Sequence, residues 1–567
     1  MSSRGDNTFE MAMLASSRPR SASHNTEYSL DSVPKPITTN NDEALLSTQR
    51  EEDEVEMGEQ EQEQEDENTL TLAQAAKRYP KLVGYCLALT IAIVGWGYDL
   101  VVVGGINSVE SFQTDYGQLY EGEKIIPAHW LSLWMALGRV GTVAGSVAGG
   151  WMQDSFGRKY SIMAGSIISA ASVTIIFFSY LLADIEGRRG VFLAGKIIQG
   201  FSVGVIKTTA MTYVSENAPT SLRGSAMALF PTFTLVGQLL GSLVLFGVNG
   251  VHGKVGYLAA IGSQWILALL PFILSCVMPD SPSYLLRKGR ESDALRAAQR
   301  LFEPRVNASN IIGKTKLAIR QEESTNEESE AKTTYMDCFR GTHRRRTWIV
   351  ILANLFPAAF GLDHLSNSSY FLQTLGLDSG LSLIFLILGI AVGMLANGAS
   401  IFLLPKVGRR AATLGSMGAA GVLWCAMGVA GAWGGINKAV AYATSAFLLL
   451  IIAICGVGCW PAGYAIMGET SSLRLRAKTQ AVGGVAQQSS SVVLSVVLPY
   501  IFNPDSGHAG AKTGFLFAGL CAMAEVACWF SIPEMKGRSI TDIDHMFDIR
   551  LPTRKFKTWN REGGECM

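Results

Sequence analysis

The chain has 567 residues, of which 48% are hydrophobic and 59 are glycine, and its formal net charge at pH 7 is zero. From Lys81 onward, apolar stretches of about twenty residues recur, each long enough to cross a hydrocarbon core roughly 30 Å thick. This pattern excludes a soluble multidomain protein, and a zero net charge gives no reason to expect a nucleic-acid partner.

The first segment, residues 1–75, is polar. Its run from 51 to 67 consists mostly of Glu, Asp and Gln and has no core-forming pattern. We expect a disordered cytoplasmic tail. It lacks the apolar stretch of a cleavable signal peptide, so the first membrane helix should direct the chain to the membrane.

Twelve apolar segments follow in two groups of six. They cover approximately residues 82–104, 129–151, 160–183, 191–214, 226–248 and 261–277, then 348–370, 382–404, 412–433, 439–467, 481–502 and 513–532. In the polar stretch between the groups, residues 291–302 have the spacing of a short amphipathic helix. The expected organisation is a tail (1–75), a six-helix bundle (76–286), a cytoplasmic linker with short helices (287–346), a second six-helix bundle (347–534) and a cytoplasmic C-terminal tail (535–567).

Lysine and arginine gather in every second loop. Positive residues beside membrane helices are retained in the cytoplasm, so these loops and both termini are expected there, in a multi-pass protein of the plasma membrane. The residues concerned are Arg158 and Lys159, Arg223, residues 344–346, Arg409 and Arg410, and Arg474, Arg476 and Lys478.

The nine cysteines predict neither a disulfide framework nor a metal site, because seven of them lie inside apolar stretches without metal-ligand spacing. No glycine-rich phosphate loop precedes a helix, and no nucleophile, base and third residue converge. We therefore expect no enzyme activity, no cofactor and no metal. We also expect the protein to be a monomer.

Small residues recur at helical spacing in two of the expected helices. Gly141, Gly145 and Gly149 follow one another every four residues in the second, as do Gly200 and Gly204 in the fourth. Such spacing allows helix backbones to approach closely in lipid.

Charged side chains inside the expected helices are the strongest functional leads, because an ionised group in a membrane usually faces water or a partner. Asp99 lies about 7 Å below the outer end of the first helix, and Lys196 lies at the same depth in the fourth, at about 1.5 Å per residue. The two can pair, and a carboxyl group takes up a proton more readily when its lysine partner moves away. The pair is therefore either a proton switch or a permanent salt bridge that fixes helix packing.

Three more charges are buried in the expected helices. Arg139 near the middle of the second helix and Asp363 in the outer half of the seventh can face a cavity, where each is equally a substrate contact or a structural ion pair. Lys207 lies on the same stripe as Lys196, about 16 Å deeper, and cannot share Asp99 from there.

Several segments resemble a known family. Residues 150–159, GWMQDSFGRK, resemble the loop signature of the major facilitator superfamily, in which Asp154 can bond the start of a neighbouring helix. Residues 213–224, 279–285 and 533–538 resemble the marker motifs of the sugar porter family. The match narrows to fungal maltose and general α-glucoside permeases through residues 71–75, 97–99, 338–340, 469–479 and 503–504.

This resemblance implies an all-α membrane protein with the major facilitator fold, whose two six-helix bundles enclose a solute site near the midplane. It implies that Asp99 couples protons with Lys196 as its partner. It further implies cytoplasmic charge networks that lock the outward-facing state, formed by Asp154, Arg158, Glu216 and Arg223 in the first half and by Arg409, Glu469 and Arg476 in the second.

The resemblance also implies a substrate site. Gln238 and Gln487 match sugar-binding glutamines of the family and Tyr464 replaces a tenth-helix aromatic; Gln488, Arg139 and Asp363 complete the expected set. The chain departs from the family elsewhere: hydroxyl-binding amides are replaced by Pro231, Pro357, Ala358 and Asp363, and Pro405 stands where an aspartate is usual.

The expected function is proton-coupled uptake of a sugar, an α-glucoside such as maltose or a related hexose or polyol, by alternating access. The lost amides, together with Arg139 and Lys207, keep open a carrier or exporter of a non-sugar metabolite, perhaps an acidic or less hydroxylated compound. A nutrient receptor that does not transport is the remote alternative.

Overall fold

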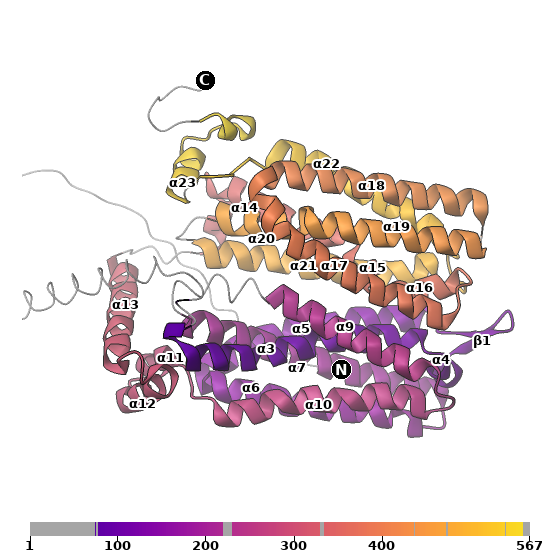
Figure 1. The fold of residues 1–567 in the computed structure, drawn as a ribbon, viewed down its shortest axis with the longest axis horizontal. Coiled ribbons are helices and arrows are strands. Elements are labelled where there is room, and N and C mark those ends of the chain that lie inside the picture. The colour runs from indigo at the N-terminus through magenta and orange to yellow at the C-terminus, as the bar shows by residue number, and fades with distance from the viewer. Residues whose placement is uncertain are drawn as a thin grey trace, which may run out of the picture. The chain divides into compact units, whose positions relative to one another are not determined.

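The computed structural model describes residue 74 and residues 77–218, 230–328, 334–435, 437–471, 475–538 and 540–559. Within these ranges, twelve helices are long and apolar enough to cross a membrane. Six precede the linker and six follow it, as the hydropathy pattern predicts. Figure 1 shows them as a violet-to-magenta group and an orange-to-yellow group, which we call the first and second bundles.

The first bundle also carries a small hairpin between its first two spans. Strands β1 (Gln118–Tyr120) and β2 (Glu123–Ile125) pair antiparallel, with Gln118 opposite Ile125. They follow η1 (Ile106–Ser108) and α4 (Glu110–Tyr116). The membrane helices are α3 (Pro80–Gly105), α5 (Ala128–Phe156), α6 (Arg158–Phe178, continued by η2, Ser179–Leu181), α7 (Ile185–Asn217), α9 (Phe230–Asn249) and α10 (Val255–Val277).

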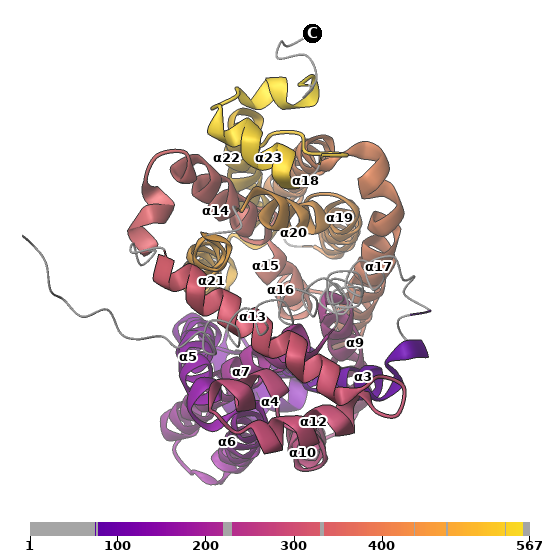
Figure 2. The same ribbon diagram turned by 90° about the vertical axis from the view of Figure 1, so that its left-hand side faces the viewer.

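The linker forms three helices at the opposite end of the first bundle from the hairpin. These are α11 (Pro282–Arg287), α12 (Glu291–Phe302) and α13 (Ala308–Glu328), followed by η3 (Tyr335–Phe339). Helix α12 has the predicted bounds. Its alanines, Leu301 and Phe302 form its apolar face, which packs with Tyr79 and Leu82 near the start of α3. We call this the linker end, which faces the viewer in Figure 2, and the other the hairpin end.

The second bundle contains two interrupted spans. Its helices are α14 (His343–Ala359), α15 (Leu362–Ser366), α16 (Ser368–Thr374), α17 (Ser379–Val407), α18 (Arg409–Gly434), α19 (Lys438–Val457), α20 (Cys459–Thr470), α21 (Arg476–Phe502) and α22 (Gly514–Ser531, preceded by η5, Gly510–Thr513). The seventh and tenth spans predicted over 348–370 and 439–467 are present as His343–Ser366 and Lys438–Thr470, but neither is one continuous helix.

The seventh span breaks beside Gly361, whose φ is +82°. Pro357, inside α14, has no N–H to donate to the helix ladder. A Cβ at position 361 would lie 2.9 Å from the Phe517 ring and 3.0 Å from the Trp424 ring. A positive φ and packed rings together favour glycine here. The tenth span breaks at Gly458, whose φ is −106°, and a Cβ there would overlap the Ser416 Cβ.

The predicted close approach of glycine-bearing helices is confirmed. A Cβ on Gly141 or Gly145 would meet the backbone carbonyls of Ile197 or Phe201, so α5 and α7 lie backbone to backbone. Gly204 of α7 faces α5 reciprocally, at Thr142. The small residues thus allow dense contact in the absence of a hydrophobic force between helices.

The bundles meet along two helix pairs, α5 with α21 and α9 with α17. Polar contacts between them gather at the hairpin end, where Ser108 Oγ lies 2.6 Å from Ser369 Oγ. There too Asn503 Nδ2 donates to the Ile126 carbonyl at 2.9 Å and Ala128 N–H to Asp505 at 2.9 Å. Gln113 Nε2 also donates to Gln373 Oε1 at 2.9 Å, so a series of hydrogen bonds joins the bundles at the hairpin end.

The described part of the expected C-terminal tail, residues 535–538 and 540–559, packs against the second bundle. Helix α23 (Ile540–Asp548) places Asp544 against Arg346 of α14. Arg345 Nη1 donates to the Leu551 carbonyl at 2.6 Å, and Phe556 of η6 (Thr553–Lys557) is fully buried. The predicted segment 1–75 lies outside the described residues except for Gln74.

Candidate functional site

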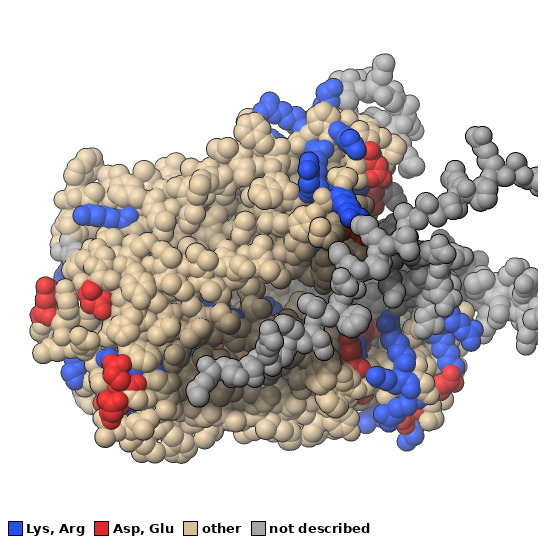
Figure 3. Space-filling view, turned by 180° about the vertical axis from the view of Figure 1, so that it is seen from behind, with Lys and Arg blue, Asp and Glu red and all other residues tan. Residues whose placement is uncertain are grey.

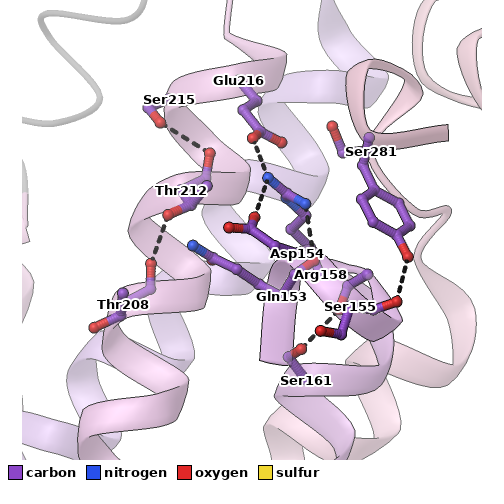
Figure 4. A network of polar contacts seen from close by, with 12 residues as sticks. Gln153, Asp154, Ser155, Arg158, Ser161, Thr208, Thr212, Ser215, Glu216 and Ser281 are labelled. Carbon is purple, nitrogen blue, oxygen red and sulfur yellow. Dashed lines mark hydrogen bonds and ion pairs between the residues drawn. The ribbon is translucent and has the colours of Figure 1, made fainter. Parts of the chain in front are cut away.

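A network of charged residues lies at the linker end of the first bundle. Arg158, buried at the start of α6, donates to Glu216 Oε1 on α7 at 2.6 Å and to the Gln153 carbonyl at 2.8 Å (Figure 4). Asp154 lies 3.5 Å from the same guanidinium, but its side chain is 72% exposed. The predicted association of these residues is therefore present within one bundle; Arg223 lies outside the described residues.

Asp280 caps the start of α6, whereas Asp154, predicted to bond the start of a neighbouring helix, contacts only the Arg158 side chain among the described residues. Asp280 Oδ1 accepts from the backbone N–H groups of Arg158 at 3.0 Å and Lys159 at 3.4 Å. Gly157, with φ +97°, turns the chain so that these N–H groups face the segment after α10. Asp154 instead lies on the exposed side of the last turn of α5. Burial raises the pKa of the neighbouring Tyr284 phenol, whose ring stacks under Arg158 at 5.0 Å.

The second bundle repeats this arrangement. Glu534 accepts from the backbone N–H groups of Arg409 at 3.0 Å and Arg410 at 3.1 Å, after Gly408 with φ +96°. The Arg409 side chain donates to Glu469 at 2.7 Å. Arg476 makes a different contact: its Nη2 donates to the Gly468 carbonyl at 3.2 Å, and it is not in ion-pair contact with Glu469. The capping roles of Asp280 and Glu534 were missed, although both residues lie in the quoted motifs.

The charge networks are predicted to lock the outward-facing state. In the present conformer both Arg158–Glu216 and Arg409–Glu469 are formed, yet each stays within its own bundle. The polar contacts that join the bundles lie at the hairpin end and, through Arg139 and Asp363, further along α5. The lock between halves is therefore a prediction for another conformer.

Asp99 and Lys196 do not form the predicted ion pair here. The Asp99 carboxyl on α3 interacts with the side chain of Gln199 on α7. Lys196 Nζ donates to the Val103 carbonyl at 3.3 Å. Val103 follows Asp99 by one helical turn, so the amine lies about one turn nearer the hairpin end than the carboxyl group. The predicted neighbourhood is right, and the direct contact is wrong for this conformer.

Arg139 and Asp363 pair with each other in this conformer, as the structural alternative predicts, and a substrate contact by either residue stays a prediction. Arg139 Nη2 lies 2.7 Å from Asp363 Oδ1, and their side chains are 26% and 13% exposed. Arg139 belongs to α5 and Asp363 to α15, so this ion pair joins the two bundles. Arg139 also acts electrostatically on Lys196. Sequence spacing alone could not show that the two residues meet.

Lys207 lies against an aromatic ring. Its Nζ is 3.8 Å from the centroid of the Trp96 ring on α3. No carboxylate of the described residues lies within ion-pair distance of it. In Figure 3 the surface is hollowed between the bundles toward the linker end, and lysine or arginine atoms are visible inside the hollow.

The predicted solute contacts come from helices of both bundles. Gln238 belongs to α9, Tyr464 to α20, and Gln487 and Gln488 to α21. Within the described part of the chain, the three glutamine side chains make no hydrogen bond. Glu525 of α22 is a further, half-buried acidic residue that sequence reasoning missed, and one of its carboxyl oxygens is buried without a hydrogen-bond partner. Its position inside an apolar segment was the available signal.

Comparisons with known proteins agree with this architecture. Residues 85–547 match the family model described as "Sugar (and other) transporter". The MFS transporter fmqE of Aspergillus fumigatus is 28% identical, over 82% of this chain and 85% of the relative. Maltose permease MAL61 of Saccharomyces cerevisiae is 25% identical, over 86% of this chain and 79% of the permease.

Solved structures show the same fold. The proton:xylose symporter XylE bound to 6-bromo-6-deoxy-D-glucose has 19% identity and a TM-score of 0.61, covering 82% of this chain and 99% of XylE. A partially occluded inward-open form of XylE from E. coli has 18% identity and a TM-score of 0.64, covering 81% and 100%. With a family match over most of its length, this multi-pass membrane protein belongs to the sugar (and other) transporter family of the major facilitator superfamily.

Proposed function

We propose that the protein carries a sugar or sugar-like solute across the membrane by alternating access, in symport with protons. The observation that carries this proposal is the uneven contact between the bundles: polar contacts close the hairpin end, whereas the surface is hollowed toward the linker end (Figure 3). Rocking one bundle against the other would close the linker end and open the hairpin end. The sugar specificities in the names of the yeast relatives support a sugar-like cargo.

Asp99 is proposed as the proton acceptor. It lies inside the membrane span of α3 without a cation in ion-pair contact among the described residues, while Lys196 Nζ is held one turn away by a backbone carbonyl. A short movement of the lysine between the Val103 carbonyl and the Asp99 carboxyl would alternately stabilise and release the ionised form. That exchange would tie proton uptake to the movement of α7 along α3.

Solute recognition is assigned to the amides of Gln238, Gln487 and Gln488 and to the Tyr464 ring. Amides bond adjacent hydroxyl groups with both donor and acceptor. The basic loops at the linker end favour a cytoplasmic location for that end in the plasma membrane. The present conformer is then inward-facing, and the two arginine–glutamate pairs would join across the bundles only when the linker end closes.

A non-sugar cargo is the second candidate, favoured by one feature of the site. The seventh span presents Pro357, Ala358 and Asp363 where sugar porters carry amides, and Asp363 is occupied by Arg139. This removes hydroxyl-bonding groups from the second bundle and adds charge. Transport in the outward direction would use the same residues.

Proton coupling is tested with full-length protein in proteoliposomes. Wild type should take up labelled maltose or glucose faster under an inward proton gradient, and the solute should acidify the lumen. Asp99→Asn should abolish both responses to the gradient while leaving solute exchange at equal pH. Glu110→Gln, the same chemical change at an exposed position of α4, is the control. A proton gradient that still drives uptake in Asp99→Asn removes Asp99 from the mechanism.

A further inference from the structure

The membrane spans of the first bundle carry an excess of positive charge. Away from the helix ends, the described spans contain Arg139, Lys196 and Lys207 as cations and Asp99 as the single carboxylate. An uncompensated cation inside a membrane protein is costly. Such charges are kept when they face a partner, an aqueous path or a ligand of opposite sign.

Neither lysine has its charge cancelled within the described residues. Lys196 Nζ contacts a backbone carbonyl, and the nearest ring to it is Phe192 at 5.6 Å. Lys207 Nζ stacks on Trp96 and remains part-exposed. A cation–π contact contributes about 0.5–2 kcal/mol, and it leaves the ammonium donors free for an acceptor.

Arg139 is neutralised only by the opposite bundle. Its partner Asp363 belongs to the seventh span, and the contact therefore ends whenever the bundles separate at the hairpin end. In that state Arg139 would lose its partner, and Asp99 would be the single carboxylate left to balance Arg139, Lys196 and Lys207 within the described spans of the first bundle. The site is suited to an anion, and a neutral sugar would leave its charge excess unchanged.

We propose that the transported solute bears a carboxylate, held by the Lys207 ammonium beside the Trp96 ring, with a hydroxylated body on the glutamines. This inference rests on the proposed transport function and narrows its cargo to sugar acids or similar hydroxylated monocarboxylates. A charged hydrogen bond to a carboxylate in a part-buried site contributes enough to strengthen binding by roughly 10- to 100-fold over the uncharged analogue.

The test compares matched solutes on the purified full-length protein. D-Glucuronate is paired with D-glucose, and maltobionate with maltose, and the affinity of each is measured by isothermal titration calorimetry at one ionic strength. The acid of at least one pair should bind roughly 10- to 100-fold more tightly than its neutral partner. Lys207→Met should bring the acid to the affinity of the neutral solute without altering the latter, and Lys207→Arg should retain the preference. Lys254→Met, at an exposed lysine at the start of α10, is the matched control.

The outcomes separate this inference from the proposed function. Neutral solutes that bind as tightly as their acids, or acids that do not bind at all, overturn the inference even in wild type, so the result does not depend on how well the variants fold. An equal loss of both solutes in Lys207→Met also overturns it. Counterflow of maltose or glucose without acid preference would leave sugar transport standing; acid binding without transport of any solute would refute transport alone.

Discussion

The ion pair between Arg139 and Asp363 should hold the hairpin end closed. Removing one partner of a fully buried pair costs about 3–5 kcal/mol, whereas an exposed pair contributes about 0–1 kcal/mol. With the two side chains 26% and 13% exposed, we expect Asp363→Asn to weaken closure by about 1–3 kcal/mol. That corresponds to a 5- to 150-fold shift in the ratio of closed to open hairpin ends.

The shift can be measured as a distance between the bundles. Spin labels are placed at Glu110 on α4 and at Ser506 beyond α21, both exposed at the hairpin end, in a background without native cysteines. Double electron–electron resonance then reports the two populations. In Asp363→Asn the longer distance should grow, and the double variant with Arg139→Gln should add little further, because the pair is already broken.

The control is an ion pair of similar length that does not cross the bundles. Arg189 and Glu186, both on α7, lie 2.6 Å apart at the hairpin end. Glu186→Gln should leave the distance distribution unchanged. A distribution in Asp363→Asn that equals wild type, or an equal change in both variants, would show that this contact does not govern closure.

Two further predictions concern stability, measured as the midpoint of thermal unfolding in detergent. Gly361→Ala should cost about 1–3 kcal/mol more than Gly376→Ala, because both have positive φ but only position 361 faces the Phe517 ring; equal shifts would contradict the steric reason. Asp280→Ala and Glu534→Ala should each cost about 0.5–2 kcal/mol through loss of a helix cap, and Asp280→Asn should recover most of it; an effect at only one position would show that the two caps are not equivalent.

The membrane architecture could be predicted because it depends on local composition. Twelve spans, their grouping, the amphipathic helix over 291–302 and the close packing of the glycine-bearing helices all follow from apolar length and residue spacing. The breaks at Gly361 and Gly458 were missed. Hydropathy is insensitive to them, since a helix interrupted within protein is as apolar as a continuous one.

The sequence identified the residues of the candidate site better than it identified the contacts between them. The Arg158–Glu216 and Arg409–Glu469 pairs are present as expected from the motifs. The Asp280 cap on α6 was missed, because this acceptor comes from a segment more than a hundred residues away in the chain. The glutamines and Tyr464 keep their predicted role as a proposal.

The sequence by itself determined that Asp99, Arg139, Lys196, Lys207 and Asp363 lie inside membrane spans, because the cost of an ionised group in lipid makes those positions stand out. Only the tertiary structure decided their partners: Arg139 pairs with Asp363 across the bundles, Lys196 rests on a carbonyl one turn from Asp99, and Lys207 stacks on Trp96. The reason is that a partner depends on the distance between side chains from separate helices, and this distance is set by the packing of both bundles in one conformer.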